Sequence, residues 1–355
     1  MAFATLHDVA EAAGVSYATV DRVVNARGGV SQKSVLRVQA AIKQLGYARD
    51  VSAANLARKR VYRFLFLLPE DHNDFFHSLY SALQSHAQRP NLLRIAVTTT
   101  RLPAFSEKAL IEALARIDPA TVDCACVVAL DTPAVNAAVQ RVRAQGVKLV
   151  TLVSDIDAAS RDAYVGIDNY VAGKTAGRMM GLCHGRQPGL VLPIIGTSRA
   201  HDHIQRLSGF LEIMQAHFPQ ITLLEPVTSR DEAATIHREL DDIWRAHPNL
   251  TGVYNMGAGN DGLVAWIRGI TGRDRPFMVI HELLPNARTA LEAGLVDAVI
   301  DQKPKEIITR TMDAMRLLVD GEALPTPAPV ITPAIYLCEN LPDTPKETDW
   351  MPSND

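Results

Sequence analysis

The sequence contains no long hydrophobic run. Nowhere in its 355 residues does a stretch approach the ~20 uninterrupted apolar residues that a membrane-spanning helix needs. The N-terminal stretch MAFATLHDVAEAAGVS also lacks the basic and apolar regions of a signal peptide. We therefore expect a protein of the cytoplasm with no membrane partner. Its length exceeds one typical compact unit and suggests two or three.

Cysteine is scarce, with four residues in the whole chain. Cys124 and Cys126 share the apolar run DCACVVAL, which is typical of a buried strand. A metal site would need more ligands nearby at suitable spacing. We interpret the cysteines as reduced thiols and expect neither a metal nor a cofactor.

Motifs of common catalytic sites are missing as well. The chain has no GxSxG elbow, no P-loop and no HExxH. His201 and His203 fall in a segment that we predict as a loop, without further ligand spacing. The glycine-rich NMGAGN at 255–260 lacks GxGxxG spacing, and we interpret it as a tight loop that opens a helix, with Asn255 or Asn260 facing a ligand. An enzyme is therefore only the alternative interpretation.

The net charge is small, −3, but its sign is unevenly distributed. Residues 1–60 contain nine Lys and Arg against four Asp and Glu, a balance of +5, so the remainder carries −8. A basic N-terminal segment on an acidic body favours a local polyanion-binding module.

The N-terminal segment begins with two short helical patterns. The first spans roughly Leu6–Ala13, with Thr5 as N-cap and Asp8 in an acidic variant of the capping box. The second spans about Tyr17–Asn25, and Ser16 is placed to cap it. Two helices joined by a tight turn with glycine indicate a helix-turn-helix.

A third helical pattern opens at Ser31. Its apolar side chains recur on one face, at Val35, Val38, Ile42 and Leu45. We expect the three helices to share one small core. The first two helices and their turn supply to it Leu6, Val9, Ala10, Val15, Val20, Val23 and Val24.

The second helix would enter the major groove of DNA. Its predicted outward residues are Tyr17, Ala18, Asp21, Arg22 and Asn25. Arg22 can donate in a fork to guanine O6 and N7, while Tyr17 and Asn25 can reach bases or phosphates. Spacing alone would also fit a small helical subdomain whose polar residues are merely solvated.

The segments TLHDVAEAAGVSYATVDRVVN and VSQKSVLRVQAAIKQLGY resemble the headpiece of the LacI/GalR repressor family almost position by position. With the body, the resemblance covers about residues 5–340. It implies a transcriptional regulator, typically a repressor, that binds a pseudo-palindromic double-stranded DNA operator. On this basis Thr5, Ser16 and Ser31 join the candidate DNA-binding residues.

One headpiece position departs from the family pattern. Members usually carry serine where this chain has Asp21. A carboxylate there would be repelled by a phosphate, but it could accept from a cytosine amino group or hold Arg22 by a local ion pair. Both roles stay open.

Residues 50–60, DVSAANLARKR, resemble the hinge of the same family. They contain few large apolar groups and cannot bury enough area to fold alone. The resemblance implies that Leu56 wedges into the minor groove when two hinges pair on DNA. A plain linker is the alternative. We predict a headpiece at 1–49, this hinge at 50–60, a core at 61–340 and a tail at 341–355.

The core alternates apolar runs with amphipathic stretches, which indicates α/β lobes with parallel, doubly wound sheets. Predicted strands are YRFLFLL, LLRIAV, CACVVAL, KLVTLV, LVLPII, GVYN and FMVI. Predicted helices lie near Phe75–His86, Pro133–Gln145, Val171–Cys183, Ile204–His217 and Glu232–His247. We expect one lobe from about 61–165 and 298–325, and a second from about 168–296.

Ligands of such folds bind where the carboxyl ends of strands face a crevice. Polar or aromatic residues follow several predicted strands. These candidate effector-binding residues are Phe75, Phe76, Ser154, Asp155, Asn255, His281, Glu282 and Gln302. Asp301 also follows a strand. Phenylalanine stacks on the C–H faces of a sugar, and the polar groups match its hydroxyls.

The series resembles type I periplasmic sugar-binding proteins, especially ribose-type ones, and implies a sugar or polyol effector. In that group an aromatic pair stacks on the sugar and an arginine before a glycine-aromatic pair binds hydroxyls. The arginine here is Arg206 in QRLSGF. Three roles stay open. One of Phe75 and Phe76 belongs to the core, and Arg206 can instead form a surface ion pair. Asp168 is either a ligand contact or a helix cap. His281-Glu282 departs from the usual aromatic-Asp pair.

One headpiece offers too little contact area for tight specific binding, so we expect a homodimer built through the body. The tail PDTPKETDWMPSND has no apolar heptads and cannot form a helical bundle. A transport binding protein would share the body fold but would not carry the headpiece. The sequence therefore favours an effector-controlled regulator.

Overall fold

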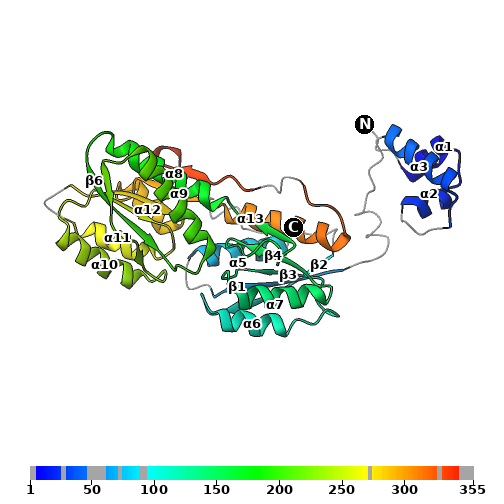
Figure 1. The fold of residues 1–355 in the computed structure, drawn as a ribbon, viewed down its shortest axis with the longest axis horizontal. Coiled ribbons are helices and arrows are strands. Elements are labelled where there is room, and N and C mark those ends of the chain that lie inside the picture. Colours follow the sequence, from blue (N-terminus) through cyan, green and yellow to red (C-terminus); the bar gives the residue numbers. More distant parts are fainter. Residues whose placement is uncertain are drawn as a thin grey trace, which may run out of the picture. The chain divides into compact units, whose positions relative to one another are not determined.

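The computed structural model describes residues 5–24, 29–45, 61–70, 74–87, 94–270, 274–325 and 330–343. The chain falls into two compact units (Figure 1). The first contains the helices α1–α3, and the second contains the strands and the later helices. No helix in these ranges is long and apolar enough to cross a membrane.

The headpiece helices begin where the sequence placed their caps. They are α1 (Leu6–Ala13), α2 (Tyr17–Val24) and α3 (Gln32–Leu45). The predicted capping box is confirmed, because the Asp8 amide donates to Thr5 Oγ1 at 3.3 Å and the Thr5 amide donates to Asp8 Oδ2 at 2.7 Å. Ser16 and Ser31 accept amide N–H groups at the starts of α2 and α3. Asn25, predicted at the end of α2, lies outside the described residues.

All seven apolar residues predicted for the headpiece core from the first two helices pack together, with Val38 and Ala41 from α3. Val9, Val20 and Val38 are fully buried. Val35 and Leu45, predicted on the apolar face of α3, are corrections, because both lie outside this cluster and Leu45 is 37% exposed.

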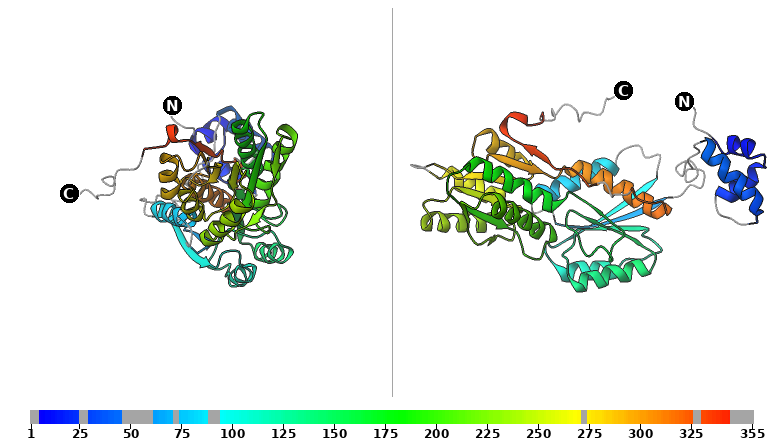
Figure 2. Two further views of the ribbon diagram at one scale, coloured as in Figure 1. Left: turned by 90° about the vertical axis from the view of Figure 1, so that its left-hand side faces the viewer. Right: turned by 45° about the horizontal axis from the view of Figure 1, so that its top comes forward.

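The first sheet of the body has five parallel strands in the order β2-β1-β3-β4-β5. These are β1 (Tyr62–Pro69), β2 (Ile95–Leu102), β3 (Cys124–Val127), β4 (Lys148–Leu152) and β5 (Ala163–Val165). One face packs on α5 (Asp74–Ala87) and α13 (Pro304–Asp320). The other packs on α6 (Glu107–Ala115) and α7 (Pro133–Ala144), as Figure 2 also shows.

The second sheet runs β12-β11-β10-β9-β6-β7, with β8 paired to β6. Its strands are β6 (Gly189–Ile195), β7 (Ile221–Leu223), β8 (Val227–Thr228), β9 (Gly252–Asn255), β10 (Phe277–His281), β11 (Ala298–Asp301) and β12 (Ala334–Tyr336). Only β12 is antiparallel among its described pairs. A short 3-10 helix, η1 (Cys338–Asn340), follows β12.

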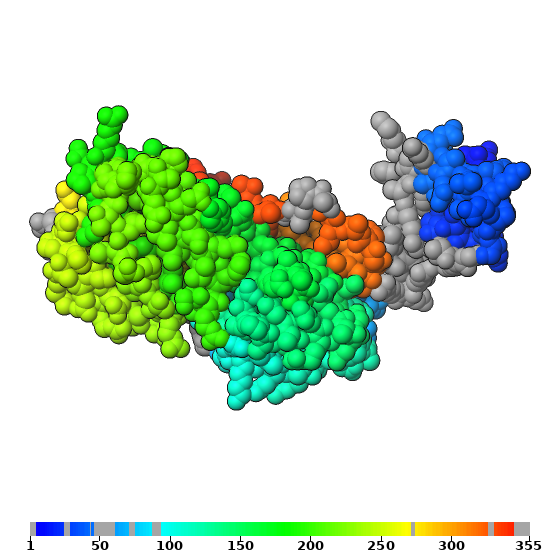
Figure 3. All heavy atoms as spheres, in the orientation of Figure 1, coloured from blue at the N-terminus to red at the C-terminus, as the bar shows by residue number. Residues whose placement is uncertain are grey.

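Helices cover both faces of the second sheet as well. One apolar cluster packs α10 (Ala233–Ala246), α11 (Asn260–Arg268) and α12 (Pro285–Glu292) on one face. The other face meets α8 (Asn169–His184) and α9 (His201–His217), whose cluster continues into the α5 and α13 side of the first sheet. The two lobes appear as adjoining masses in the space-filling view, green to yellow beside cyan (Figure 3).

The expected fold class is confirmed, but three local expectations are wrong. Residues 298–301 form β11, which pairs with β10 in the second sheet rather than belonging to the first lobe. The chain returns to the first lobe only with α13. The apolar run AVI carries no signal for which sheet it joins, so its pairing with β10 could not be predicted from the sequence. The second strand spans Ile95–Leu102, later than LLRIAV. His201 and His203 lie in the first turn of α9, not in a loop.

The helices α8 and α9 cross at two glycines that leave no room for a side chain. A Cβ on Gly173 would lie 1.9 Å from the Arg206 carbonyl oxygen, and one on Gly209 would lie 2.1 Å from the Tyr170 carbonyl oxygen. Both obstacles are backbone atoms, which cannot rotate away as a flexible side chain could. The crossing therefore fixes the backbone of Arg206.

We predict that Gly209→Ala destabilises the body. The added methyl group must push the two helix backbones apart, and overpacking of this kind costs ~1–3 kcal/mol. Urea denaturation measures the loss, with Ser208→Ala on the exposed side of α9 as the matched control. An unchanged unfolding free energy in Gly209→Ala would show that the crossing tolerates expansion.

Candidate ligand-binding site

A cavity of about 660 Å³ lies where the carboxyl ends of both sheets face each other. Segments that follow β1, β2, β3 and β4 line it from the first lobe. Segments that follow β6, β8, β9, β10 and β11 line it from the second lobe. This is the position in which doubly wound folds bind ligands.

The first lobe contributes mainly apolar side chains. Phe75 and Phe76 both line the cavity, with ring centroids 5.5 Å apart in an edge-to-face arrangement. Phe75 is 5% exposed and also packs into the core, whereas Phe76 is only half-buried. Phe105, from the loop after β2, adds a third ring that the sequence reasoning missed. Phe75 is therefore the phenylalanine that belongs to the core, although it also lines the cavity.

Arg206 lies at the centre of the polar side and is only 2% exposed. Its Nε donates to Asn169 Oδ1 at 2.8 Å, and its Nη1 donates to the Met256 carbonyl oxygen at 2.6 Å. Its Nη2 lies 4.0 Å from Asp202 Oδ2. The side chain is therefore held by α8, by the loop after β9 and by its own helix, and it is not a surface ion-pair residue.

Asp202 and His203 precede Arg206 on the first turn of α9, and both are buried in the cavity wall. Burial raises the pKa of the Asp202 carboxyl, but the positive potential of His203 and Arg206 outweighs it, so the pKa lies below its ordinary value. His203 Nδ1 accepts the Thr197 amide at 3.2 Å. The sequence reasoning missed both residues because it placed them in a loop.

Asp231 is a second acidic residue in the wall, and it too was missed. It follows the two-residue strand β8, which is too short to produce a periodic pattern. The Ala258 amide donates to Asp231 Oδ1 at 3.0 Å. A Cβ on Gly196 or Gly257 would lie 2.3 or 2.2 Å from that same oxygen, so glycine is needed at both positions. Burial raises the pKa of this carboxyl.

Glu282 and Gln302 come from the ends of β10 and β11 and meet at the cavity. Gln302 Nε2 donates to Glu282 Oε1 at 2.5 Å. Burial, reinforced by the nearby Asp301 carboxylate, raises the pKa of Glu282 to about 8. At neutral pH this carboxyl is therefore mostly protonated and can donate as well as accept a hydrogen bond.

Four buried polar atoms in the wall have no hydrogen-bond partner within the described chain. They are Ser154 Oγ, Asp202 Oδ1, Arg206 Nη2 and Gln302 Oε1, although the Ser154 hydroxyl group lies close enough to the Asp202 carboxyl to lower its pKa. Buried polar groups are normally paired, and leaving one unpaired costs ~1–3 kcal/mol. Their convergence on one cavity indicates a polar ligand that supplies the missing partners.

The backbone around the cavity is unusually strained. Among the described non-glycine residues with left-handed φ, five line the cavity: Phe105, Val153, Arg230, Asp231 and Glu282. Such conformations cost energy and gather at ligand-binding sites, where the surrounding structure enforces them. The φ of 72° at Glu282 turns its side chain to the cavity directly after His281, whose side chain stays in the core.

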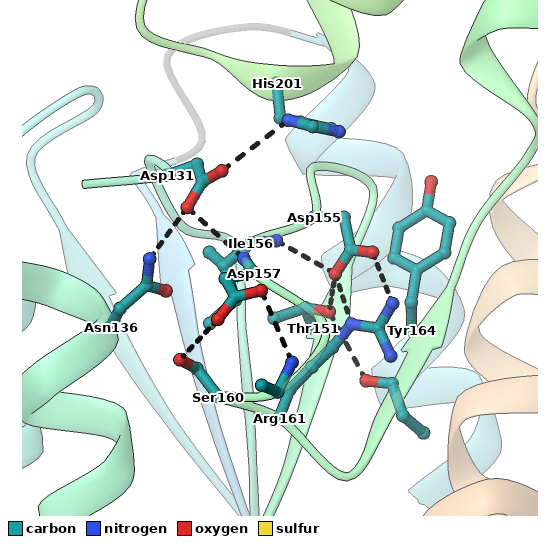
Figure 4. A network of polar contacts seen from close by, with 12 residues as sticks. Asp131, Asn136, Thr151, Asp155, Ile156, Asp157, Ser160, Arg161, Tyr164 and His201 are labelled. Atoms are coloured by element: carbon teal, nitrogen blue, oxygen red, sulfur yellow. Dashed lines mark hydrogen bonds and ion pairs between the residues drawn. The ribbon is translucent and has the colours of Figure 1, made fainter. Parts of the chain in front are cut away.

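Three predicted effector residues do not line the cavity. Asp155 instead holds Arg161, whose Nη2 lies 2.6 Å from Asp155 Oδ2, and it also accepts from Thr151 and Ile156 (Figure 4). Asn255 donates to Asn260 Oδ1 at 2.8 Å, so Asn260 rather than Asn255 faces the cavity.

His281 is fully buried and shares a hydrogen bond of 2.8 Å with Tyr254. Burial, with Arg206 and His203 nearby, holds its pKa well below the ordinary value, so it stays neutral. Asp168 is a helix cap, because its Oδ1 accepts the Val171 amide at 2.9 Å and the residue is exposed.

Two contacts join the lobes beside the cavity. His201 Nδ1 lies 3.8 Å from Asp131 Oδ2. Figure 4 shows the two side chains pointing toward one another. Asp131 follows β3 in the first lobe, whereas His201 begins α9 in the second. Arg199 forms an ion pair with Glu107 of α6. These exposed pairs contribute little energy individually, but they connect the two sides of the cavity opening.

On the headpiece, the outward face of α2 is exposed as expected. Tyr17 is 46% exposed, and Ala18 and Arg22 are also exposed, while Asp21 is half-buried. Arg22 adjoins Gly29, where a Cβ would lie 3.9 Å from its Nη1. Asn25 and Leu56 lie outside the described residues.

We predict that Glu282 lowers the stability of the body as pH rises from about 4.5 to about 8. Over this window the folded protein keeps the Glu282 proton whereas the unfolded chain releases it, so unfolding becomes easier with rising pH. Glu282→Gln should flatten this slope, because the amide keeps the shape without titrating. Denaturation at several pH values measures it, and parallel slopes in the two proteins would rule out Glu282 as the source.

Curated relatives match limited stretches of the chain. The chain is 32% identical over 104 residues to the HTH-type transcriptional regulator DegA of Bacillus subtilis, covering 29% of this chain and 31% of that protein. It is 40% identical over 81 residues to the sucrose operon repressor of Streptococcus mutans, covering 23% and 25%. It is 52% identical over 56 residues to the lactose operon repressor of Escherichia coli, covering 16% of each. The matched stretch thus spans less than a third of each of these relatives.

Solved structures share the fold of the body. A solute binding protein from Burkholderia graminis in complex with D-arabinose covers 79% of this chain and 96% of its own, with 20% identity and a TM-score of 0.71. A glucose-galactose binding protein from Geobacillus stearothermophilus covers 80% and 99%, with 19% identity and a TM-score of 0.71.

Two family descriptions divide the sequence between them. Residues 64–323 match the periplasmic binding protein domain, and residues 5–50 match the bacterial regulatory proteins of the lacI family. The chain therefore belongs to the periplasmic binding protein domain family through its body, and its headpiece matches the lacI family over residues 5–50.

Proposed function

We propose that this chain is a sequence-specific transcriptional regulator, a repressor in its simplest form, whose operator affinity responds to a sugar or polyol bound in the cavity. The observation that carries the proposal is the union of a lacI-family headpiece with a cavity of unpartnered polar atoms. Neither part alone would imply regulation by a ligand. We place such a regulator in the cytoplasm, with the DNA that it binds.

The DNA-binding surface centres on α2. Tyr17, Ala18 and Arg22 are exposed on this helix and are free to meet base edges, with Thr5, Ser16 and Ser31 at the helix starts available to phosphates. We propose that two copies act on one pseudo-palindromic operator, since one headpiece buries too little surface. Residues 50–60 would form the hinge, with Leu56 in the minor groove.

The cavity favours a polyhydroxy ligand. Phe75, Phe76 and Phe105 offer apolar faces, while the unpartnered atoms of Ser154, Asp202, Arg206 and Gln302 offer donors and acceptors. Because the lining comes from both lobes, a bound ligand would favour one arrangement of the lobes over another. That differential affinity is what can change operator binding.

A transport binding protein is the main alternative, since proteins of this type share the body fold. The headpiece argues against this alternative, because transport does not require a lacI-family segment that has a capped helix and a buried core of its own. An enzyme on the same fold is less favoured still, because regulators, not enzymes, are what the headpiece resembles.

The proposal is tested by a thermal-shift screen with D-arabinose, D-galactose, D-allose, D-ribose, sucrose and sorbitol, followed by DNA binding with and without each hit. We expect at least one compound to raise the melting temperature and to change the affinity for a selected operator. Stabilising hits that leave DNA binding unchanged would exclude a regulator controlled by this cavity.

We predict that Arg22→Ala weakens binding to the selected operator by about 1–3 kcal/mol, because a forked contact to guanine is lost. Binding to random DNA should change much less. Competition electrophoresis measures both. Lys33→Ala on α3, also an exposed cation of the headpiece, is the matched control. If Arg22→Ala weakens binding to operator and to random DNA equally, Arg22 contacts a phosphate rather than a base.

We predict that Arg206→Lys abolishes the ligand response while the unliganded protein still binds operator. Lysine cannot hold Asn169 and the Met256 carbonyl group and also face a ligand, because it lacks the planar fork. Calorimetry measures ligand binding, and Arg161→Lys, at an ion pair away from the cavity, is the matched control. Undiminished ligand affinity in Arg206→Lys would place the ligand elsewhere.

A further inference from the structure

The charge of the cavity wall sets a condition on its ligand. Asp202 and Asp231 bring two carboxyl groups to the wall, and Glu107, Glu232 and Asp261 bring three more. Glu282 also lines the wall, but its carboxyl is mostly protonated at neutral pH. Against these, Arg206 and Arg230 are the arginines or lysines in the described lining.

Both arginines face carboxyl groups of the protein. Two of the three nitrogens of Arg206 already donate within the protein, and the third faces Asp202 at 4.0 Å. Arg230 has 76% of its side chain exposed, and its Nε lies 3.9 Å from Glu232 Oε1. The Arg206 Nη2 atom is a cationic donor without a hydrogen-bond partner in the wall, but a phosphate group placed on it would also lie beside the Asp202 carboxylate.

The hydrogen-bonding capacity of the wall also disfavours an anionic ligand. Of the four unpartnered wall atoms, Asp202 Oδ1 and Gln302 Oε1 can only accept, Ser154 Oγ can do either, and only Arg206 Nη2 must donate. The missing partners are thus mostly donors. Sugar hydroxyl groups supply donors, whereas a phosphate dianion or a carboxylate presents acceptors only.

One feature of the wall would favour an anion, namely its helix N-termini. The helices α9, α10 and α11 all begin at the cavity, and no side chain caps their first turns. Their positive ends attract negative charge. At α9 and α11 the chain itself supplies that charge, because Asp202 and Asp261 lie in their first turns and Asp231 accepts the Ala258 amide just before α11, whereas the first turn of α10 has no acidic residue.

We propose that the effector of this cavity carries no negative charge: it is an uncharged sugar or polyol rather than its phosphate ester or sugar acid, and Asp202 and Asp231 are the residues that exclude anions. This inference rests on the proposed function of the cavity as the effector site. It adds a specificity rule that the fold itself does not impose, because the rule depends on side chains of this chain.

Calorimetry on the full chain tests the rule with pairs that differ in charge. The probes are D-ribose with D-ribose 5-phosphate, D-glucose with D-glucose 6-phosphate, and D-glucuronamide with D-glucuronate, which have nearly the same shape. For each pair whose neutral member binds, we expect the anion to bind roughly 100-fold more weakly or worse. A phosphate or uronate that binds as tightly as its neutral partner overturns the inference but leaves the proposed function standing.

Variants then identify the excluding residues. Asp231→Asn and Asp202→Asn remove a charge at constant shape, so each should raise the affinity of the anion relative to its neutral partner by about 10-fold or more. Asp242→Asn, at an exposed residue of α10 outside the lining, should leave that ratio unchanged. Thermal melting checks that each variant folds. A ratio unchanged in both Asp231→Asn and Asp202→Asn overturns the assignment, and absence of binding by every probe overturns the proposed function together with this inference.

Discussion

The arrangement of the cavity depends on how Arg206 is held. Its guanidinium donates to Asn169 on α8 and to the Met256 carbonyl group after β9, and it faces Asp202 on its own helix. Its backbone is fixed by the contact with Gly173. A buried cation needs such partners, because desolvation without them costs several kcal/mol. The partners in turn place Asp202 and the loop of Gly257 around one space, so a single charge organises the second-lobe side of the site.

The first lobe contributes shape more than charge. Phe75 and Phe76 reach the cavity from α5, which the core anchors through Leu79 and Leu83. The strained backbone at Val153 and Phe105 turns the loops of this lobe toward the second. A site with the phenylalanine rings on one lobe and most of the unpartnered polar atoms on the other is complete only when the lobes adjoin. A ligand that touches both sides can therefore report its presence through lobe arrangement.

Local signals in the sequence were sufficient for much of the fold. Three helix starts could be predicted because side-chain capping depends on residue type. The capping residues are Thr5 with Asp8, Ser16 and Ser31. The start of α9 was missed because its N-cap, Ala200, makes no side-chain hydrogen bond. The sheet that β11 joins could not be predicted, since strand pairing is a long-range choice that an apolar run does not encode.

The candidate site was predicted in part, for related reasons. Ser154, Arg206, Glu282 and Gln302 line the cavity together with both phenylalanines, because residues after parallel strands converge at one edge. Asp155 was assigned there too, but Arg161, six residues later, takes its carboxylate. Asp231 escaped notice because β8 has only two residues. Position after a strand predicts the neighbourhood of a side chain, while its direction depends on partners that the sequence does not reveal.

The central claim is that the headpiece and the cavity act as one coupled system. The most direct measurement compares two pairs of dissociation constants. The first pair is that of an identified sugar ligand for the full chain, without operator DNA and saturated with it. The second pair is that of the operator DNA for the full chain, without the ligand and saturated with it. If the two sites are coupled, the two ratios are equal by thermodynamic linkage and differ from one, typically by 5- to 150-fold. A ligand constant that is the same with and without operator would contradict the account.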